Sequence, residues 1–90
     1  MSNVDEMIAL VTKEPKQDGG DFRGFDLNGI SLNGASFIFA TVAEVVMDES
    51  QLLDIDFSQA NMEKSSMKNA KIKNVNFSGS NLEDVNFEGT

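Results

Sequence analysis

The chain has 90 residues, a net charge of −8, no cysteine and no histidine. This length makes a single domain, and the missing residue types exclude disulfides, thiol nucleophiles and histidine-based catalysis or metal binding. The acidity disfavours direct nucleic-acid binding, which needs a basic patch, and no apolar run is long enough to span a membrane.

Residues 1–19 predict a short helix followed by a polar connector. Asn3 with Glu6 three residues later matches a capping box, and Pro15 ends the helical pattern. The apolar residues between them recur at helical spacing: Val4, Met7, Ile8 and Val11. This helix either binds a partner or covers the first repeat, and we favour the cover because terminal repeats need caps. The acidic N-terminus differs from a signal peptide, so we expect a cytoplasmic protein.

From residue 20 the chain repeats every five residues. The third place is apolar in all fourteen blocks: Phe22, Leu27, Leu32, Phe37, Val42, Met47, Leu52, Phe57, Met62, Met67, Ile72, Phe77, Leu82 and Phe87. The place two residues earlier is small or apolar, the place between is often Asp or Asn, and Gly often ends the block. A period of five fits neither an amphipathic helix nor an ordinary strand, so the pattern indicates a repeat architecture.

Over residues 20–89 this pattern resembles the pentapeptide-repeat family, whose consensus is roughly A-(D/N)-L-x-x. The resemblance implies a bacterial protein and an all-β solenoid. That solenoid is a right-handed quadrilateral β-helix, in which each block forms one side and four blocks form one coil. Fourteen blocks then give about 3.5 coils. We therefore expect a short N-terminal capping α-helix with its connector over residues 1–19 and the β-helix over residues 20–90.

A twenty-residue coil places residues that are twenty apart on top of each other, at a spacing of about 4.8 Å. We expect Phe37, Phe57 and Phe77 to form one buried column of stacked rings. On the outside, two columns alternate in charge and are expected to pair between coils: Glu44, Lys64 and Asp84, and Asp48, Lys68 and Glu88.

The outward places hold two sets of candidate partner-binding residues. The first set is acidic and concentrated in the first coils: Asp21, Asp26, Glu44, Asp48, Glu49, Asp54 and Asp56. The second set is apolar at places that should face water: Ile38, Phe39 and Leu53, accompanied by Val46. An exposed apolar cluster marks an interface, unless the N-terminal helix or a local bulge covers it.

The serines have no histidine to activate them and the lysines carry no sign of burial, so we predict no enzyme, no metal site and no cofactor. Some members of the family imitate the shape and charge of duplex DNA. The resemblance thus implies a protein-binding module that inhibits a nucleic-acid-handling enzyme or complex. The alternative is a structural scaffold that presents a flat side to a protein partner. The last coil has no evident capping helix, and its open edge favours a homodimer through the C-terminal coil.

Overall fold

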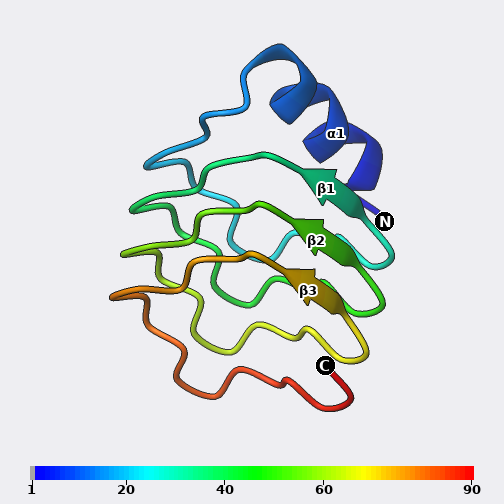
Figure 1. Cartoon of the computed structure of the whole chain (residues 1–90), viewed down its shortest axis with the longest axis vertical. Coiled ribbons are helices and arrows are strands. Elements are labelled where there is room, and N and C mark those ends of the chain that lie inside the picture. Colours follow the sequence, from blue (N-terminus) through cyan, green and yellow to red (C-terminus); the bar gives the residue numbers. More distant parts are fainter. Residues whose placement is uncertain (1) are drawn as a thin grey trace.

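The computed structural model describes residues 2–90, which form one helix and a stack of coils (Figure 1). The helix α1 spans Val4–Lys13, and the strands are β1 Ser31–Asn33, β2 Gln51–Leu53 and β3 Lys71–Lys73. The strands form a parallel sheet in the order β1-β2-β3, with Leu32 opposite Leu52 and Leu52 opposite Ile72. Each pair is twenty residues apart, as the sequence predicts.

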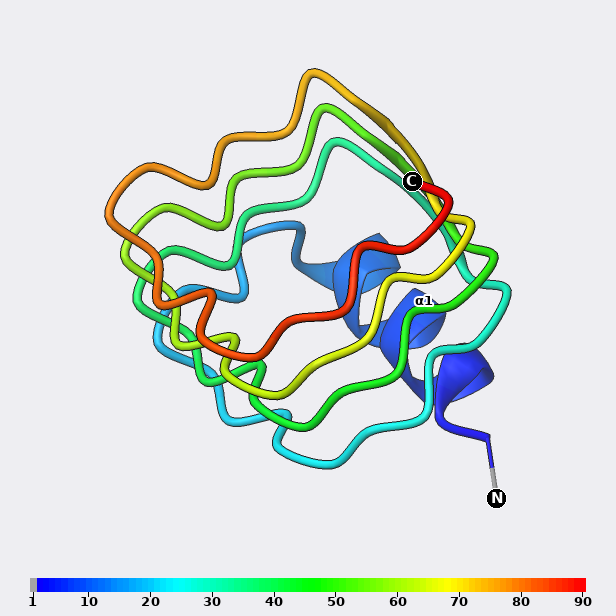
Figure 2. The same cartoon turned by 90° about the horizontal axis from the view of Figure 1, so that it is seen from below.

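The same spacing joins the rest of the stack. Nine isolated parallel bridges, such as Lys16 with Ser36 and Asp21 with Thr41, also connect residues twenty apart. Together with the sheet they form four ladders, so one coil has four sides (Figure 2). We name the sides by their residues: side A is 15–19, 35–39, 55–59 and 75–79; side B is 20–24, 40–44, 60–64 and 80–84; side C is 25–29, 45–49, 65–69 and 85–89; side D is 30–34, 50–54 and 70–74.

The Asp or Asn in the second place of a block has a local structural role. Its side-chain Oδ1 accepts a hydrogen bond from the backbone N–H two residues later, as Asp56 does from Ser58 at 2.8 Å. The same bond forms in six further blocks, those of Asp21, Asp26, Asn61, Asn76, Asn81 and Asn86. This Asx turn satisfies a backbone donor that the ladders between coils do not use. The repeat therefore favours Asp and Asn at this place because of hydrogen bonding, whatever their charge.

Each block ends at a corner with a left-handed backbone. All fifteen residues at this fifth place have a positive φ, from 54° at Asn74 to 79° at Gly34. Glycine adopts this region without strain, which explains why six of the corners carry it. The other nine carry side chains, including Phe39, Glu49 and Asp54. The stack thus imposes a conformation that such residues rarely adopt.

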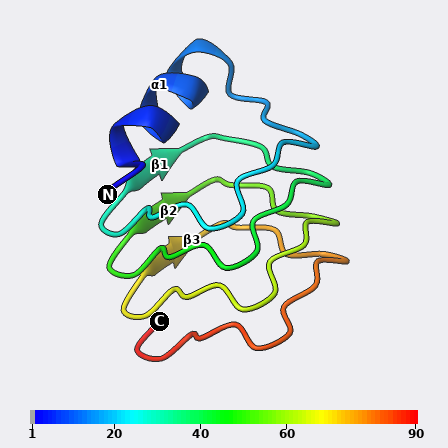
Figure 3. The same ribbon diagram turned by 180° about the vertical axis from the view of Figure 1, so that it is seen from behind.

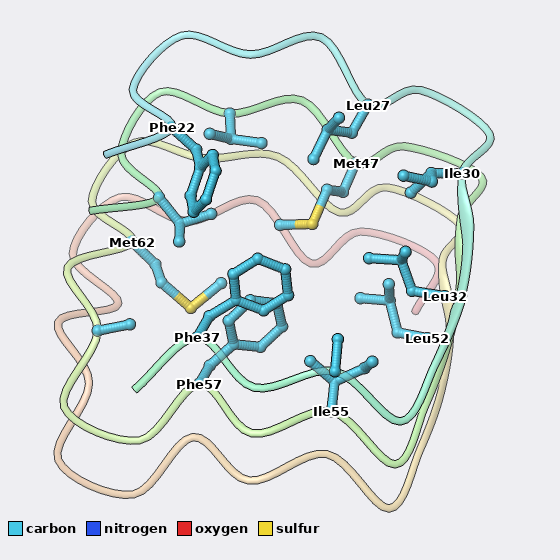
Figure 4. Close-up of a cluster of buried hydrophobic side chains, with 14 of the residues drawn as sticks. Phe22, Leu27, Ile30, Leu32, Phe37, Met47, Leu52, Ile55, Phe57 and Met62 are labelled. Atoms are coloured by element: carbon cyan, nitrogen blue, oxygen red, sulfur yellow. The ribbon is translucent and has the colours of Figure 1, made fainter. Parts of the chain in front are cut away.

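The first and third places of the blocks face the interior and form the core (Figure 4). Phe37, Phe57 and Phe77 form the predicted column, with successive ring centroids 5.4 and 5.8 Å apart and interplanar angles of 20° and 16°. Ser50 is a polar residue in this core, and its buried Oγ has no hydrogen-bond partner among residues 2–90. Stacked rings of one residue type favour the register in which each coil meets its equivalent in the next.

The two ends of the stack differ (Figure 3). Helix α1 covers the first coil, and its Met7 is buried in the core cluster, so the helix is the expected cover. At the other end Phe77 and Leu82 are only partly buried, and Phe87 is 37% exposed. Apolar surface therefore remains open on the last coil. Within residues 2–90 no helix is long and apolar enough to cross a membrane.

The capping box expected at the start of α1 does not form. Asn3 is the N-cap residue, but its side chain makes no capping bond to the described helix. Its Nδ2 donates to Glu6 Oε1 at 3.2 Å, and its Oδ1 accepts from the backbone N–H of Asp26 at 2.7 Å. The Asn3 side chain thus joins the helix to side C. Helix-start rules could not predict this bond because they consider only the residues of the helix itself.

Candidate binding surfaces

Charged residues are distributed unevenly around the four sides. Sides B and C carry nine acidic and three basic residues: Asp21, Arg23, Asp26, Glu44, Asp48, Glu49, Glu63, Lys64, Lys68, Glu83, Asp84 and Glu88. Sides A and D carry three of each: Lys16, Asp18, Asp54, Asp56, Lys71 and Lys73. Because sides B and C follow each other around every coil, the excess negative charge belongs to one half of the perimeter (Figure 2).

The structure brings five of the seven predicted acidic residues onto this half. The five are Asp21 and Glu44 on side B, and Asp26, Asp48 and Glu49 on side C. The other two lie elsewhere, with Asp54 on side D and Asp56 on side A. The acidic candidates therefore do not form a single site.

Four further acidic residues of this half escape prediction from the sequence: Glu63, Glu83, Asp84 and Glu88. Along the chain four lysines lie between Glu63 and Glu83, so the last coils look balanced in charge. In the structure Lys71 and Lys73 lie on side D and leave this half more acidic than the local sequence indicates. Counting charges at intervals of twenty residues would have found the four.

Several of these carboxylates also hold the stack together. Asp21 and Asp26 form the Asx turns described above. Asp48 Oδ1 accepts hydrogen bonds from Ser66 Oγ and from the Lys68 N–H, both in the next coil. Within residues 2–90 no group of three or more His, Cys, Asp or Glu side chains could hold a metal ion. Removing one of these Asp side chains would therefore change local structure as well as charge, whereas Asp→Asn changes mainly the charge.

The alternating columns do not pair between coils as expected. Among residues 2–90 the ion pairs are those of Arg23 Nη1 with Glu44 Oε1 at 3.4 Å and of Arg23 Nη2 with Glu63 Oε1 at 3.8 Å. Neither Lys64 nor Lys68 forms an ion pair with a described residue. The side chains of Arg23 and Glu44 are about half exposed, so their pair contributes little to stability.

The predicted apolar cluster has one exposed residue, Phe39, and the others are half-buried. Phe39 is 69% exposed, and helix α1 at the end of the stack does not cover it. Ile38 and Leu53 are half-buried, on sides A and D respectively. Phe39 also has a φ of 60°, at a corner where the equivalent residues of two other coils are Gly19 and Gly79. Phe39 thus combines a strained backbone with an unburied ring, which folding stability does not explain.

A comparison with known families accounts for the five-residue repeat. The family model described as pentapeptide repeats matches residues 50–89 with eight copies. Residues 50–89 are therefore repeats of the pentapeptide-repeat family. Residues 20–49 lie outside this match, but the same ladders run through both parts of the pentapeptide-repeat stack.

Solved structures of pentapeptide repeat proteins resemble this chain. HetL, involved in heterocyst differentiation regulation in the cyanobacterium Nostoc sp. strain PCC 7120, is 19% identical with a TM-score of 0.52, over 79% of this chain and 38% of HetL. A protein of the Arabidopsis thaliana thylakoid lumen is 24% identical with a TM-score of 0.32, over 77% of this chain and 63% of that protein. A protein of the cyanobacterium Cyanothece 51142 is 15% identical with a TM-score of 0.32, over 94% of this chain and 92% of that protein. A search of curated protein sequences gave no match.

The likeness to HetL concerns the fold. The chain spans 38% of the length of HetL and 63% of the length of the Arabidopsis protein. The likeness therefore does not extend to function, which depends on the surfaces of this chain.

Proposed function

We propose that this pentapeptide-repeat chain is a non-catalytic, cytoplasmic protein-binding module whose coils form a right-handed, four-sided β-helix. In the leading form of this proposal, sides B and C imitate the charge of duplex DNA. They occupy a basic cleft of a nucleic-acid-handling enzyme or complex, and the protein inhibits that target because the cleft cannot hold DNA at the same time.

The excess of acidic residues on two neighbouring sides carries this proposal. Glu44 and Glu49 stand at the corners that end these sides, while Glu83 and Glu88 lie on the same sides two coils further along the stack. Contacts to phosphates supply much of the affinity of DNA-binding proteins. A regular array of carboxylates can engage the same lysines and arginines, and its attraction weakens as salt screens exposed charges.

The size of the protein limits the target. Its longest extent is 31 Å, which includes α1 and runs along the stack (Figure 1). One turn of B-DNA is about 34 Å long. Sides B and C have four blocks each, which at about 4.8 Å per coil extend over about 14–19 Å. The acidic sides of a single chain therefore correspond to about half a turn of duplex, which suits a compact basic cleft.

The second form of the proposal is a structural scaffold without DNA mimicry, and Phe39 favours it. Aromatic residues are enriched among the few side chains that dominate binding energy at interfaces. A ring that is 69% exposed at the corner of side A would supply such an anchor, with half-buried Ile38 beside it. In this form the partner contacts side A, and Leu53 on side D lies outside or at the margin of the contact.

A second copy of the chain is a further proposed partner, through the last coil. Partly buried Leu82 and Val85 and 37%-exposed Phe87 leave apolar surface there. An exposed strand edge also presents unpaired backbone groups, which favour association. A homodimer joined in this way would leave sides B and C accessible.

Capture from a bacterial lysate distinguishes the two forms. The immobilised protein is compared with two triple variants at about 50 mM and about 300 mM salt. The first variant, Glu44→Gln, Glu49→Gln and Glu83→Gln, removes three charges from sides B and C. The matched control, Asp18→Asn, Asp54→Asn and Asp56→Asn, removes three charges from sides A and D and keeps every Oδ1 acceptor. A third variant is Phe39→Ser.

DNA mimicry predicts a nucleic-acid-handling protein that is captured at low salt, lost at high salt and lost with the first variant only. A partner that survives high salt and disappears with Phe39→Ser supports the scaffold instead. A partner that binds all variants equally would contradict both forms.

A further inference from the structure

A groove of about 210 Å³ lies between helix α1 and strand β1. Residues of both elements line it: Ile8, Val11, Thr12 and Pro15 from the helix side, and residues 31–35 from the strand side. Ile8 is 40% exposed, so the protein does not itself cover this apolar wall. The volume is below the roughly 300–1,000 Å³ of typical small-molecule sites, and it suits part of a peptide chain better than a whole ligand.

Strand β1 turns an unpaired backbone edge toward this groove. In the next coil the Gln51 N–H donates to the Ile30 C=O at 2.8 Å, and the Leu53 C=O accepts from the Gly34 N–H at 2.9 Å. The equivalent groups of β1, twenty residues earlier, are the Ser31 N–H and the Asn33 C=O. No described residue provides a hydrogen-bond partner for either group. Both residues are exposed, so water is the partner available to them in the free protein.

The neighbouring sides show what normally fills such an edge. On side A, the Pro15 C=O accepts from the Ser36 N–H at 2.9 Å. On side C, Asn3 Oδ1 accepts from the Asp26 N–H at 2.7 Å. Residues 15–19 thus pair with the next block of side A, and Asn3 pairs with the first block of side C. Above β1 the chain is helical, and the backbone of a helix cannot continue the ladder because its own groups are paired within it.

We propose that this groove binds an extended peptide of a partner protein, which adds to β1 as a further parallel strand of the sheet β1-β2-β3. The sheet defines the chemistry of this peptide. Above β2 the equivalent place is taken by β1, in which Leu32 stacks over Leu52 between the polar residues Ser31 and Asn33. The bound peptide accordingly has one aliphatic residue, placed over Leu32 and against Ile8, between small polar residues.

When a peptide binds by adding a strand to a sheet, different contacts supply affinity and specificity. Backbone hydrogen bonds to an edge strand supply affinity for any extended chain, while the pocket for one side chain selects the sequence. The site lies at the end of the stack and is independent of the acidic sides B and C. Its test is therefore independent of the proposed DNA mimicry.

A peptide with the sequence of residues 28–36, NGISLNGAS, tests the proposal because this segment occupies the equivalent place above β2. Blocked at both ends, it is titrated to about 1 mM against the labelled protein while amide NMR signals and hydrogen exchange are followed. We expect the amide signals of Ser31 and Asn33 to shift, and exchange at Ser31 to slow about tenfold or more at saturation. The same peptide carrying Leu32→Asp should not bind.

Two variants of α1 provide a matched comparison. Ile8 and Leu10 are similarly exposed, at 40% and 37%, but only Ile8 lines the groove. Ile8→Ser should weaken peptide binding about tenfold, and Leu10→Ser less than about twofold. An unchanged Ser31 signal at about 1 mM peptide, or equal weakening by both variants, overturns the proposal. Concentration-dependent protection of Ser31 without peptide also overturns it, because a second copy of the chain would then be the occupant.

Discussion

Asn3 holds helix α1 to the first coil through both backbone groups of Asp26. The Asn3 N–H donates to the Asp26 C=O at 2.8 Å, and Asn3 Oδ1 accepts from the Asp26 N–H at 2.7 Å. One residue thus satisfies the donor and the acceptor that a further coil would otherwise satisfy. The position of α1, and with it the groove beside β1, depends on this contact.

Replacing Asn3 should destabilise the protein through this contact. Asn3→Ala leaves the partly buried Asp26 N–H without its acceptor and should lower the free energy of unfolding by about 1–2 kcal/mol. Asn3→Asp keeps an acceptor oxygen but places a second carboxylate beside Glu6, so it should restore part of this loss. Urea denaturation measures both changes. Asn28→Ala is the surface control, and it should change the free energy of unfolding by less than about 0.5 kcal/mol. Equal effects of Asn3→Ala and Asn28→Ala would show that the contact contributes nothing.

The Asx turns predict a difference between two substitutions at Asp56. Asp56→Asn keeps the acceptor for the Ser58 N–H, and Asn76 makes the same bond one coil later. Its free energy of unfolding should change by less than about 0.5 kcal/mol. Asp56→Ala removes the acceptor and should lower the free energy of unfolding by about 1 kcal/mol. If Asn were as disruptive as Ala, the charge of Asp56 would matter to folding and its hydrogen bond would not.

Replacing buried Ser50 with alanine should stabilise the protein. Its Oγ has no partner among the described residues, whereas Ser65 Oγ donates to the Met62 C=O at 2.8 Å. Ser50→Ala removes an unsatisfied buried hydroxyl, and Ala70 occupies the same place one coil later. The free energy of unfolding, measured by thermal unfolding, should therefore rise by about 1 kcal/mol. Ser65→Ala should lower stability by about 0.5–1.5 kcal/mol. The opposite order of the two variants would refute this account of the core.

Phe39 should be dispensable for folding. Its positive φ costs about 1–2 kcal/mol, and glycine recovers this while losing about 0.5–1 kcal/mol to its greater freedom when unfolded. Phe39→Gly should therefore leave stability unchanged or raise it by up to about 1 kcal/mol, as measured by thermal unfolding. The buried ring Phe37 two residues earlier is the contrast, since Phe37→Ala should cost about 3–5 kcal/mol. A marked loss of stability in Phe39→Gly would mean that the exposed ring packs against the protein after all.

The repeat made most of the stack predictable from the sequence. An apolar third place with no change of phase is enough to define a twenty-residue coil and the column of Phe37, Phe57 and Phe77, because these depend only on spacing. The cap was less predictable, because Asn3 bonds to a residue 23 positions away instead of to its own helix. Phe39 and Glu49 adopt a left-handed backbone conformation. In a sequence only glycine indicates this conformation, so it was not predicted at these two residues.

The candidate surfaces were predicted less completely for a related reason. Counting charge along the chain combines residues from all four sides. Asp54 and Asp56 were therefore predicted together with the acidic residues of sides B and C, whereas the structure places them on sides D and A. Glu83 and Glu88 were not predicted, because the four lysines that precede them balance their charge in the local sequence. Whether a side chain adds to a surface depends on its position within the coil, and neighbouring blocks face different directions.

Competition with DNA tests the central claim most directly. A partner captured through sides B and C is exposed to increasing amounts of a duplex of about 20 base pairs, which spans about two helical turns. If the acidic sides imitate DNA, the duplex should release the partner in proportion to its concentration, because both bind the same basic cleft. A partner that stays bound at a saturating duplex concentration would show that protein and DNA use separate surfaces, and it would contradict DNA mimicry.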